Sequence, residues 1–135
     1  MATHLPQPIS LVICDDVIHD PQTGKIHLIG CASGFGLKIF PHKLDALTVF
    51  IALAGTPGTH SGQIFCSAPD GRKNFGSTPH SLRFTAAAPV TWAVFRIERV
   101  PFPVAGIYRL QFVCDNELLS ERQLLVRFKG GNGDV

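Results

Sequence analysis

Short runs of alternating apolar and polar residues, separated by turn residues, fill most of this chain. In the C-terminal third, a Pro- and Gly-containing corner at residues 102–106 leads into an alternating segment, and Asp115-Asn116 separates that segment from a second one. A period of two is typical of a strand with one buried face, and a short polar turn between two such strands predicts an antiparallel hairpin. Over the whole chain, the pattern predicts strands at residues 9–17, 25–31, 37–40, 46–54, 63–67, 81–88, 90–99, 107–114 and 118–128.

About eight strands at this spacing, with little helical periodicity, predict one all-β domain: an antiparallel β-sandwich of the immunoglobulin-like type. Residues 1–129 are expected to form the domain, and the polar, Gly-rich residues 130–135 a flexible C-terminal tail. Tyr108 stands at the start of a strand, two residues after Gly106, where such sandwiches place a tyrosine corner. The expected core includes Trp92, Val94, Tyr108, Leu110, Phe112 and Leu124.

Two of the expected strands, residues 46–54 and 90–97, are apolar on both faces. A sandwich strand normally turns one face to water, so something is expected to cover the outer face of these two. The cover could be a loop, a second copy of the chain or another protein. The residues expected to form an interaction surface are Phe50, Phe95 and Ile97, and a symmetric homodimer is the simplest closed arrangement.

Composition narrows the class of protein. The chain has 135 residues, enough for one domain with its own core, and 45% of them are hydrophobic against 16% charged. The net charge of +2, without a dense basic run, does not indicate a nucleic-acid-binding protein. No apolar run reaches the roughly 18 to 20 residues of a membrane helix. The first eight residues lack the features of a signal peptide, so a cytoplasmic location is expected.

The cysteines and histidines do not form a local metal-binding motif. Cys14, Cys31, Cys66 and Cys114 are far apart, without a Cys-x-x-Cys pair, and each lies in an apolar segment. We therefore expect four buried, reduced thiols that act as small core residues. The six histidines are scattered singly. No metal ion or other cofactor is expected from these spacings.

Asp15-Asp16 is the strongest candidate in the sequence for a pair of catalytic or metal-binding carboxylates. Neighbouring residues on a strand point to opposite faces, so a structural role near a strand end is the expected one. An enzyme would need Asp15, Asp16 and a histidine such as His42 to converge in three dimensions.

Two segments carry more specific motifs. The first reads Ile13-Cys14-Asp15-Asp16-Val17 and, after a turn, Gly24-Lys25-Ile26-His27-Leu28-Ile29-Gly30. The second contains Phe102-Pro103, Gly106, Tyr108-Arg109, Gln111, Asp115, Glu117-Leu118, Glu121-Arg122, Leu124 and Val126. With these motifs the chain resembles a family of small bacterial proteins of unknown function. The resemblance implies the sandwich fold and a bacterial, cytoplasmic setting, and it implies no activity, cofactor or functional residue.

These observations together predict a non-catalytic structural or interaction module that associates with itself or docks on a larger assembly. Its expected partners are a second copy or another protein, and neither nucleic acid nor a membrane. Two alternatives stay open, since fold alone does not settle function. One is an enzyme that uses Asp15, Asp16 and a histidine. The other is a small-ligand-binding sandwich with a pocket among the loops at one end, formed by Phe35, Phe40, His42 and Lys43.

Overall fold

The computed structural model describes residues 4–129, and all its regular elements are strands. They are β1 (Gln7–Cys14), β2 (Asp16–His19), β3 (Ile26–Ile29), β4 (Gly34–Leu37), β5 (His42–Ala54), β6 (Gly58–Ser67), β7 (Lys73–Gly76), β8 (His80–Phe84), β9 (Val90–Phe102), β10 (Gly106–Cys114) and β11 (Glu117–Phe128). Within this part of the chain no helix is long and apolar enough to cross a membrane. The tail expected at residues 130–135 lies outside the described residues.

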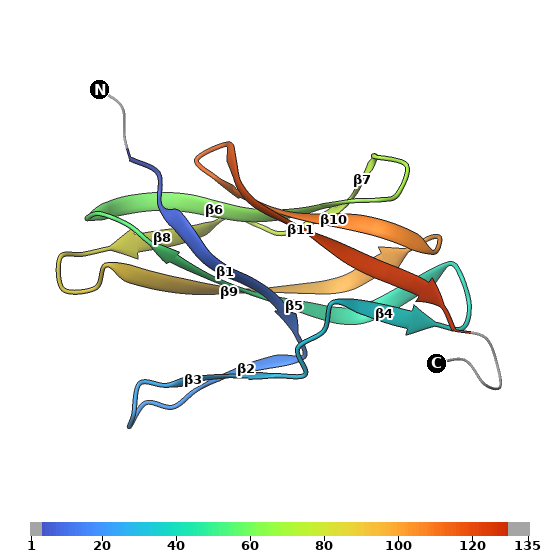
Figure 1. The fold of residues 1–135 in the computed structure, drawn as a ribbon, viewed down its shortest axis with the longest axis horizontal. Helices are drawn as coiled ribbons and strands as arrows, with labels where there is room; N and C mark the ends of the chain where they lie inside the picture. Colours follow the sequence, from blue (N-terminus) through green and yellow to red (C-terminus); the bar gives the residue numbers. More distant parts are fainter. Residues whose placement is uncertain (1–3, 130–135) are drawn as a thin grey trace.

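The strands form two layers and a separate hairpin. One sheet has the order β1-β5-β9, and the other has the order β4-β11-β10-β6-β7 with β8 also paired to β6. Strands β2 and β3 pair only with each other, and this hairpin extends from the outside of the β1-β5-β9 layer (Figure 1). The expected all-β sandwich is confirmed, with eleven strands in the described residues instead of about eight.

The order of pairing is that of an immunoglobulin-like sandwich, in which the chain crosses repeatedly between the layers. Here β1, β5 and β9 share one layer while β6, β10 and β11 share the other. The N-terminal strands contribute an edge strand to each layer. Strand β1 pairs antiparallel with β5, whereas β4 pairs parallel with β11 in the opposite layer. The β2–β3 hairpin is inserted between these two edge strands.

The core lies between the inner faces of the two sheets. On β9 the inward residues are first Phe95 and Ile97, which are 0% and 8% exposed. At Arg99 the backbone adopts a positive φ of 55°, and the inward position then passes to Val100 and Phe102, both 0% exposed. The inward positions therefore shift from odd-numbered to even-numbered residues within one continuous strand.

Two of the six residues expected in the core lie elsewhere. Trp92 is 38% exposed and Val94 is half-buried, both on the outer side of β9. The register with β5 determines this, because Val49 lies opposite Phe95 and both are 0% exposed. Since β9 is apolar on both faces, alternation could not identify the inner one. The prediction is confirmed for the other four residues, which are 0% exposed: Tyr108, Leu110, Phe112 and Leu124.

The turn between β10 and β11 has the geometry that its sequence predicts. Asp115 and Asn116 have φ angles of 50° and 67°. Two successive positive values are the signature of a tight hairpin turn, and Asp and Asn tolerate them better than most residues. The turn fixes Asp115 at one end of the sandwich.

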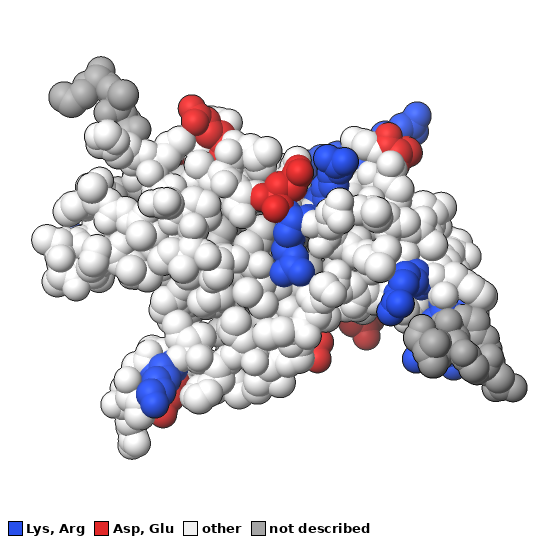
Figure 2. All heavy atoms as spheres, in the orientation of Figure 1, with Lys and Arg blue, Asp and Glu red and all other residues white. Residues whose placement is uncertain are grey.

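Charged side chains are unevenly spread over the side of the molecule on which β1 and β11 lie. Most of those visible lie over the upper and right-hand parts and at the tip of the β2–β3 hairpin (Figure 2). The area around β1 is almost free of them (Figures 1 and 2). This part of the surface therefore offers little charge–charge specificity.

Candidate functional site

The outer face of the β1-β5-β9 sheet is apolar. We use the term outer face for Val12, Phe50, Ala52, Trp92 and Val94, which are brought together by the strand register: Phe50 lies opposite Val12 and Val94, and Ala52 lies opposite Trp92. The rings of Phe50 and Trp92 stack with their centroids 6.1 Å apart, and Phe50 is only 8% exposed. The sequence signal of two-faced strands thus corresponds to a real apolar surface.

The residues expected to form that surface are only partly the right ones. Phe50 lies on the outer face, whereas Phe95 and Ile97 point into the core. The assignment of the two sides of β9 was wrong for the reason given above. Trp92 and Val94 take the places that were expected for Phe95 and Ile97.

The β2–β3 hairpin covers one end of the outer face. The ring of His19 lies 5.6 Å from that of Trp92, measured between centroids. Val17 and Leu28, which pair across the hairpin, are half-buried, whereas Ile18 and Ile29 are each 46% exposed. One side of the hairpin therefore faces the sheet, and the other adds exposed apolar area beside it.

The acidic pair and His42 are not brought together. Asp15 and Asp16 are exposed, and the carboxylate of Asp16 accepts a hydrogen bond of 2.8 Å from the N–H of Val17. The main-chain carbonyl of Asp15 accepts a bond of 3.5 Å from the hydroxyl of Thr48. Thr48 and His42 are six residues apart on β5, which corresponds to roughly 20 Å along a strand. These carboxylates therefore act as turn groups and have no access to His42.

The end of the sandwich proposed for a ligand pocket holds Phe35, Phe40, His42 and Lys43. Phe35 and Phe40 are partly buried against the core, and the rings of Phe35 and Phe102 are 5.9 Å apart. His42 and Lys43 begin β5. A ligand pocket formed by these four residues stays a prediction.

A different group of polar side chains meets near the start of β6, where β10 ends. We call His60, Cys114 and Asp115 the sandwich-end cluster. The Nδ1 atom of His60 lies 2.6 Å from Oδ2 of Asp115, and the N–H of Ser61 donates a bond of 2.9 Å to Oδ1 of the same carboxylate. The possible ligand atoms of the three cluster residues all lie within 4.8 Å of one another. His60 and Cys114 are buried, at 7% and 0% exposed.

The environment of the sandwich-end cluster shifts the pKa values of Asp115 and Cys114 in opposite directions. The hydrogen bonds from His60 and from the N–H of Ser61 lower the pKa of Asp115, so this carboxyl is ionised. Burial, with a smaller contribution from the charge of Asp115, raises the pKa of the Cys114 thiol to about 11. A protonated, buried thiol is a poor nucleophile, which argues against Cys–His catalysis here. Imidazole, thiol and carboxylate groups are, however, all metal ligands.

Sequence reasoning missed this cluster because its members are far apart in the chain. His60 and Asp115 belong to β6 and to the β10–β11 turn, and only the pairing of β6 with β10 brings them side by side. The one available signal was the turn itself, which predicts a polar residue next to Cys114 at a strand end.

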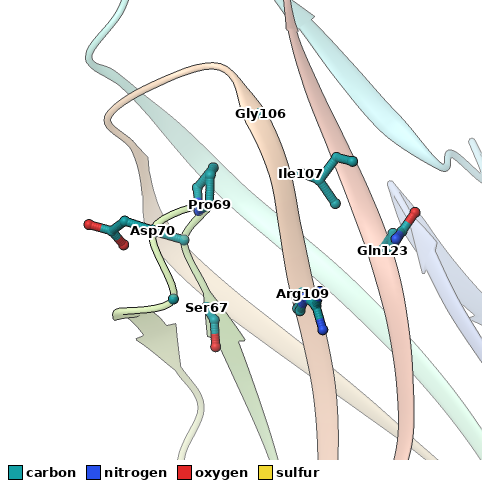
Figure 3. A pocket seen from close by; sticks show the side chains of 9 residues that line it. Ser67, Pro69, Asp70, Gly106, Ile107, Arg109 and Gln123 are labelled. Atoms are coloured by element: carbon teal, nitrogen blue, oxygen red, sulfur yellow. The ribbon is translucent and has the colours of Figure 1, made fainter.

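A hollow of about 710 Å³ lies where the β6–β7 turn approaches β10. Figure 3 shows Arg109 and Gln123 on adjacent strands, with Asp70 on the turn directed away from both. Arg109 instead lies 3.8 Å from Glu121, as an exposed pair. The polar groups around this hollow do not converge on one point. Its lining residues are Ser67, Ala68, Pro69, Asp70, Gly71, Gly106, Ile107, Arg109 and Gln123.

The four cysteines are unpaired in the structure. Cys14, Cys66 and Cys114 are buried, as the sequence predicts, but Cys31 is exposed. Cys31 follows Gly30, whose φ of 70° ends the hairpin and turns the chain outward before β4. An apolar neighbourhood in sequence therefore did not mean burial at this position.

Residues 9–127 match the model of a protein family described as a family of unknown function, DUF6941. The chain belongs to this family. No curated protein shows significant similarity to this DUF6941 protein.

Two solved structures resemble this DUF6941 protein at low sequence identity. The alkylpurine DNA glycosylase AlkC of Pseudomonas fluorescens, solved with DNA containing an abasic site analogue, is 14% identical with a TM-score of 0.47. That match covers 87% of this chain and 30% of the glycosylase chain, so the chain spans less than a third of that protein. An immunoglobulin-like protein of Pseudomonas aeruginosa is 17% identical with a TM-score of 0.43, over 94% of this chain and 100% of the other. Neither similarity bears on function.

Proposed function

We propose that this DUF6941 protein is a non-catalytic interaction module that forms a homodimer through the outer face of its β1-β5-β9 sheet. The observation that carries the proposal is Trp92, a large aromatic side chain that is 38% exposed on an apolar sheet face. Tryptophan is among the residues most enriched at the energetic centres of protein interfaces. Val90, on the same side of β9, is 53% exposed and extends the apolar area to the start of the strand.

The absence of charge on the outer face favours a second copy as the occupant. Opposite Thr48, at one end of the apolar area, stands Arg96, and the outer-face positions from there to Trp92 are uncharged. A net charge of +2 on the whole chain gives two copies little reason to repel one another. A two-fold arrangement places the same apolar patch on both sides of the interface, which suits a surface without charge pairs.

The size of a stable interface indicates which further residues take part. Specific dimers bury about 800 Å² on each partner, which is more than one exposed tryptophan and its neighbours provide. The β2–β3 hairpin stands beside the outer face, and its Ile18 and Ile29 are each 46% exposed. We therefore include the hairpin in the proposed interface. A bacterial, cytoplasmic setting completes the proposal, and the four unpaired cysteines fit the reducing compartment that it includes.

Light scattering coupled to size-exclusion chromatography over a wide range of concentrations tests the proposal. The protein should show a dimer mass that dissociates on dilution, and Trp92→Glu should shift it toward the monomer. Ile107→Glu is the matched control, because Ile107 is 46% exposed on the outer side of the opposite sheet. A monomer mass at every concentration, or equal effects of the two substitutions, would contradict the homodimer. Phe95 is unsuitable as a probe because a charge at this buried position would unfold the protein.

A further inference from the structure

We infer that the sandwich-end cluster is a Zn²⁺ site in which His60, Cys114 and Asp115 are the ligands. Nitrogen, sulfur and oxygen donors of these types are those that Zn²⁺ takes in proteins. The inference does not depend on the proposed homodimer, because the cluster lies near the start of β6 and the end of β10 and not on the outer face.

The distances allow one ion to reach all three side chains. Zinc binds these donors at about 2.0 to 2.3 Å, so two ligands of a tetrahedral site are roughly 3.3 to 3.6 Å apart. The donors of the cluster lie within 4.8 Å of one another, and His60 Nδ1 is 2.6 Å from Asp115 Oδ2. Binding thus requires the imidazole and the carboxylate to separate slightly and the sulfur to approach. Side-chain adjustments of about an ångström are sufficient.

The charges of the cluster balance those of a divalent ion. The Asp115 carboxylate and the Cys114 thiolate carry one negative charge each, and the imidazole is neutral when it binds a metal. Binding forms the sulfur–zinc bond and releases the thiol proton to solvent, so the assembled site is electrically neutral. Neutrality matters here because His60 and Cys114 are almost completely buried, where an unbalanced charge is costly.

The surrounding backbone holds the carboxylate in place. The Ser61 N–H bonds Asp115 Oδ1 at 2.9 Å, and the Asp115 N–H donates a bond of 2.9 Å to the Ser61 carbonyl. Such contacts around a ligand fix its orientation and strengthen metal binding. They leave Oδ2 directed toward His60.

An ion can reach the cluster from the side of Asp115. Its side chain is 39% exposed, so the carboxylate is open to solvent at the β10–β11 turn. A water molecule on this side can complete four-coordination. Three protein ligands and one exchangeable position make an open site, unlike the closed sites of structural zinc.

Cobalt(II) is a suitable probe because it replaces zinc in such sites and is coloured. The untagged, chelator-treated protein is titrated with Co²⁺ and then with Zn²⁺. We expect one equivalent of Co²⁺ to bind with a near-ultraviolet thiolate-to-cobalt band, and Zn²⁺ to abolish that band. Failure of the band to appear would overturn the inference.

Variants locate the site on these three residues. Cys114→Ala should remove the thiolate band, and Asp115→Asn should weaken Co²⁺ binding at least tenfold, a loss typical for perturbed metal sites. Cys31→Ala and His80→Gln are the controls, since one removes the exposed thiol and the other a histidine outside the cluster. Both should keep the band. A band that survives Cys114→Ala, or is lost in Cys31→Ala, would place the metal elsewhere and overturn the inference.

Folding of the metal-free variants is checked by far-ultraviolet circular dichroism. If Cys114→Ala does not fold, Asp115→Asn and His60→Gln supply the decisive measurement, because each removes a donor while the thiolate band still reports binding. Unchanged cobalt affinity in both would exclude the site.

Discussion

The hydroxyl of Tyr108 donates a hydrogen bond of 2.6 Å to the main-chain carbonyl of Val104. The same oxygen accepts a weaker bond of 3.3 Å from the Val104 N–H. Tyr108 is 0% exposed, and its ring packs edge-on against Phe102, the last residue of β9. This is the tyrosine corner that the sequence predicts, and it ties down the segment that carries the chain from one sheet to the other.

Replacement of Tyr108 by Phe isolates the contribution of the corner, because the ring remains and only the hydroxyl is lost. The hydrogen bond to Val104 closes a loop between the sheets, so its removal should lower the free energy of unfolding by about 1 kcal/mol. Chemical denaturation, monitored by far-ultraviolet circular dichroism, measures the change in the free energy of unfolding. An unfolding free energy equal to that of the wild type would show that the corner does not stabilise the fold.

Leu110 tests the assignment of faces on β10. It is 0% exposed in the core, so Leu110→Ala should cost roughly 2 to 5 kcal/mol through lost burial and the cavity left behind. Ile107→Ala, on the opposite face of the same strand, is the control and should cost only about 0.5 kcal/mol, as for surface positions. Denaturant melts of the two variants should therefore differ clearly. Similar losses would mean that β10 has no distinct buried face.

The β10–β11 hairpin shows how far the sequence alone leads. Its alternation, its Asp115-Asn116 turn and its tyrosine corner were all predictable, because each depends on neighbours in the chain. Strand β9 was not, because apolar residues on both faces leave the choice of inner face to its register with β5. The local backbone change at Arg99 also shifts the inward positions by one residue, which no periodicity reveals.

The sandwich-end cluster was unpredictable for a related reason. His60 and Asp115 are 55 residues apart, and their contact depends on the long-range pairing of β6 with β10. The position of the β2–β3 hairpin also depends on a distant pairing. The hairpin lies where the chain passes from β1 in one sheet to β4 in the other, and β4 belongs to that second sheet because it pairs with β11. Local patterns predicted the strands. The sandwich-end cluster and the place of the hairpin depend instead on contacts between strands that are far apart in the sequence.

The four thiols should differ sharply in reactivity. Cys31 is exposed, whereas Cys14, Cys66 and Cys114 are buried and burial raises the pKa of each of the three. Under native, non-reducing conditions a thiol-specific chromogenic reagent should modify one cysteine quickly, and Cys31→Ser should remove that fast phase. In denaturant the total should rise to four. A total of two in denaturant would instead reveal a disulfide bond.

Alkaline pH should destabilise the fold through Cys66. This thiol is 0% exposed, and burial raises its pKa to about 12. In the unfolded chain a cysteine titrates near pH 8.5 to 9, roughly three units lower. Between these values the unfolded state has lost the proton and the folded state has kept it. The unfolded state then binds fewer protons, so the free energy of unfolding falls as the pH rises, by up to about 1.4 kcal/mol per pH unit.

A comparison with Cys66→Ala separates this effect from the titration of other groups. Every other titratable group, Tyr108 and Cys114 included, is the same in both proteins, so the difference between the two pH profiles belongs to Cys66. The variant should be less stable at neutral pH because a buried side chain is shortened, yet lose stability less steeply above pH 9. Denaturant melts at a series of alkaline pH values give both slopes. If the slopes were parallel, the Cys66 thiol would titrate alike in the folded and unfolded states, and the dry environment between the two sheets would not extend to this position of β6.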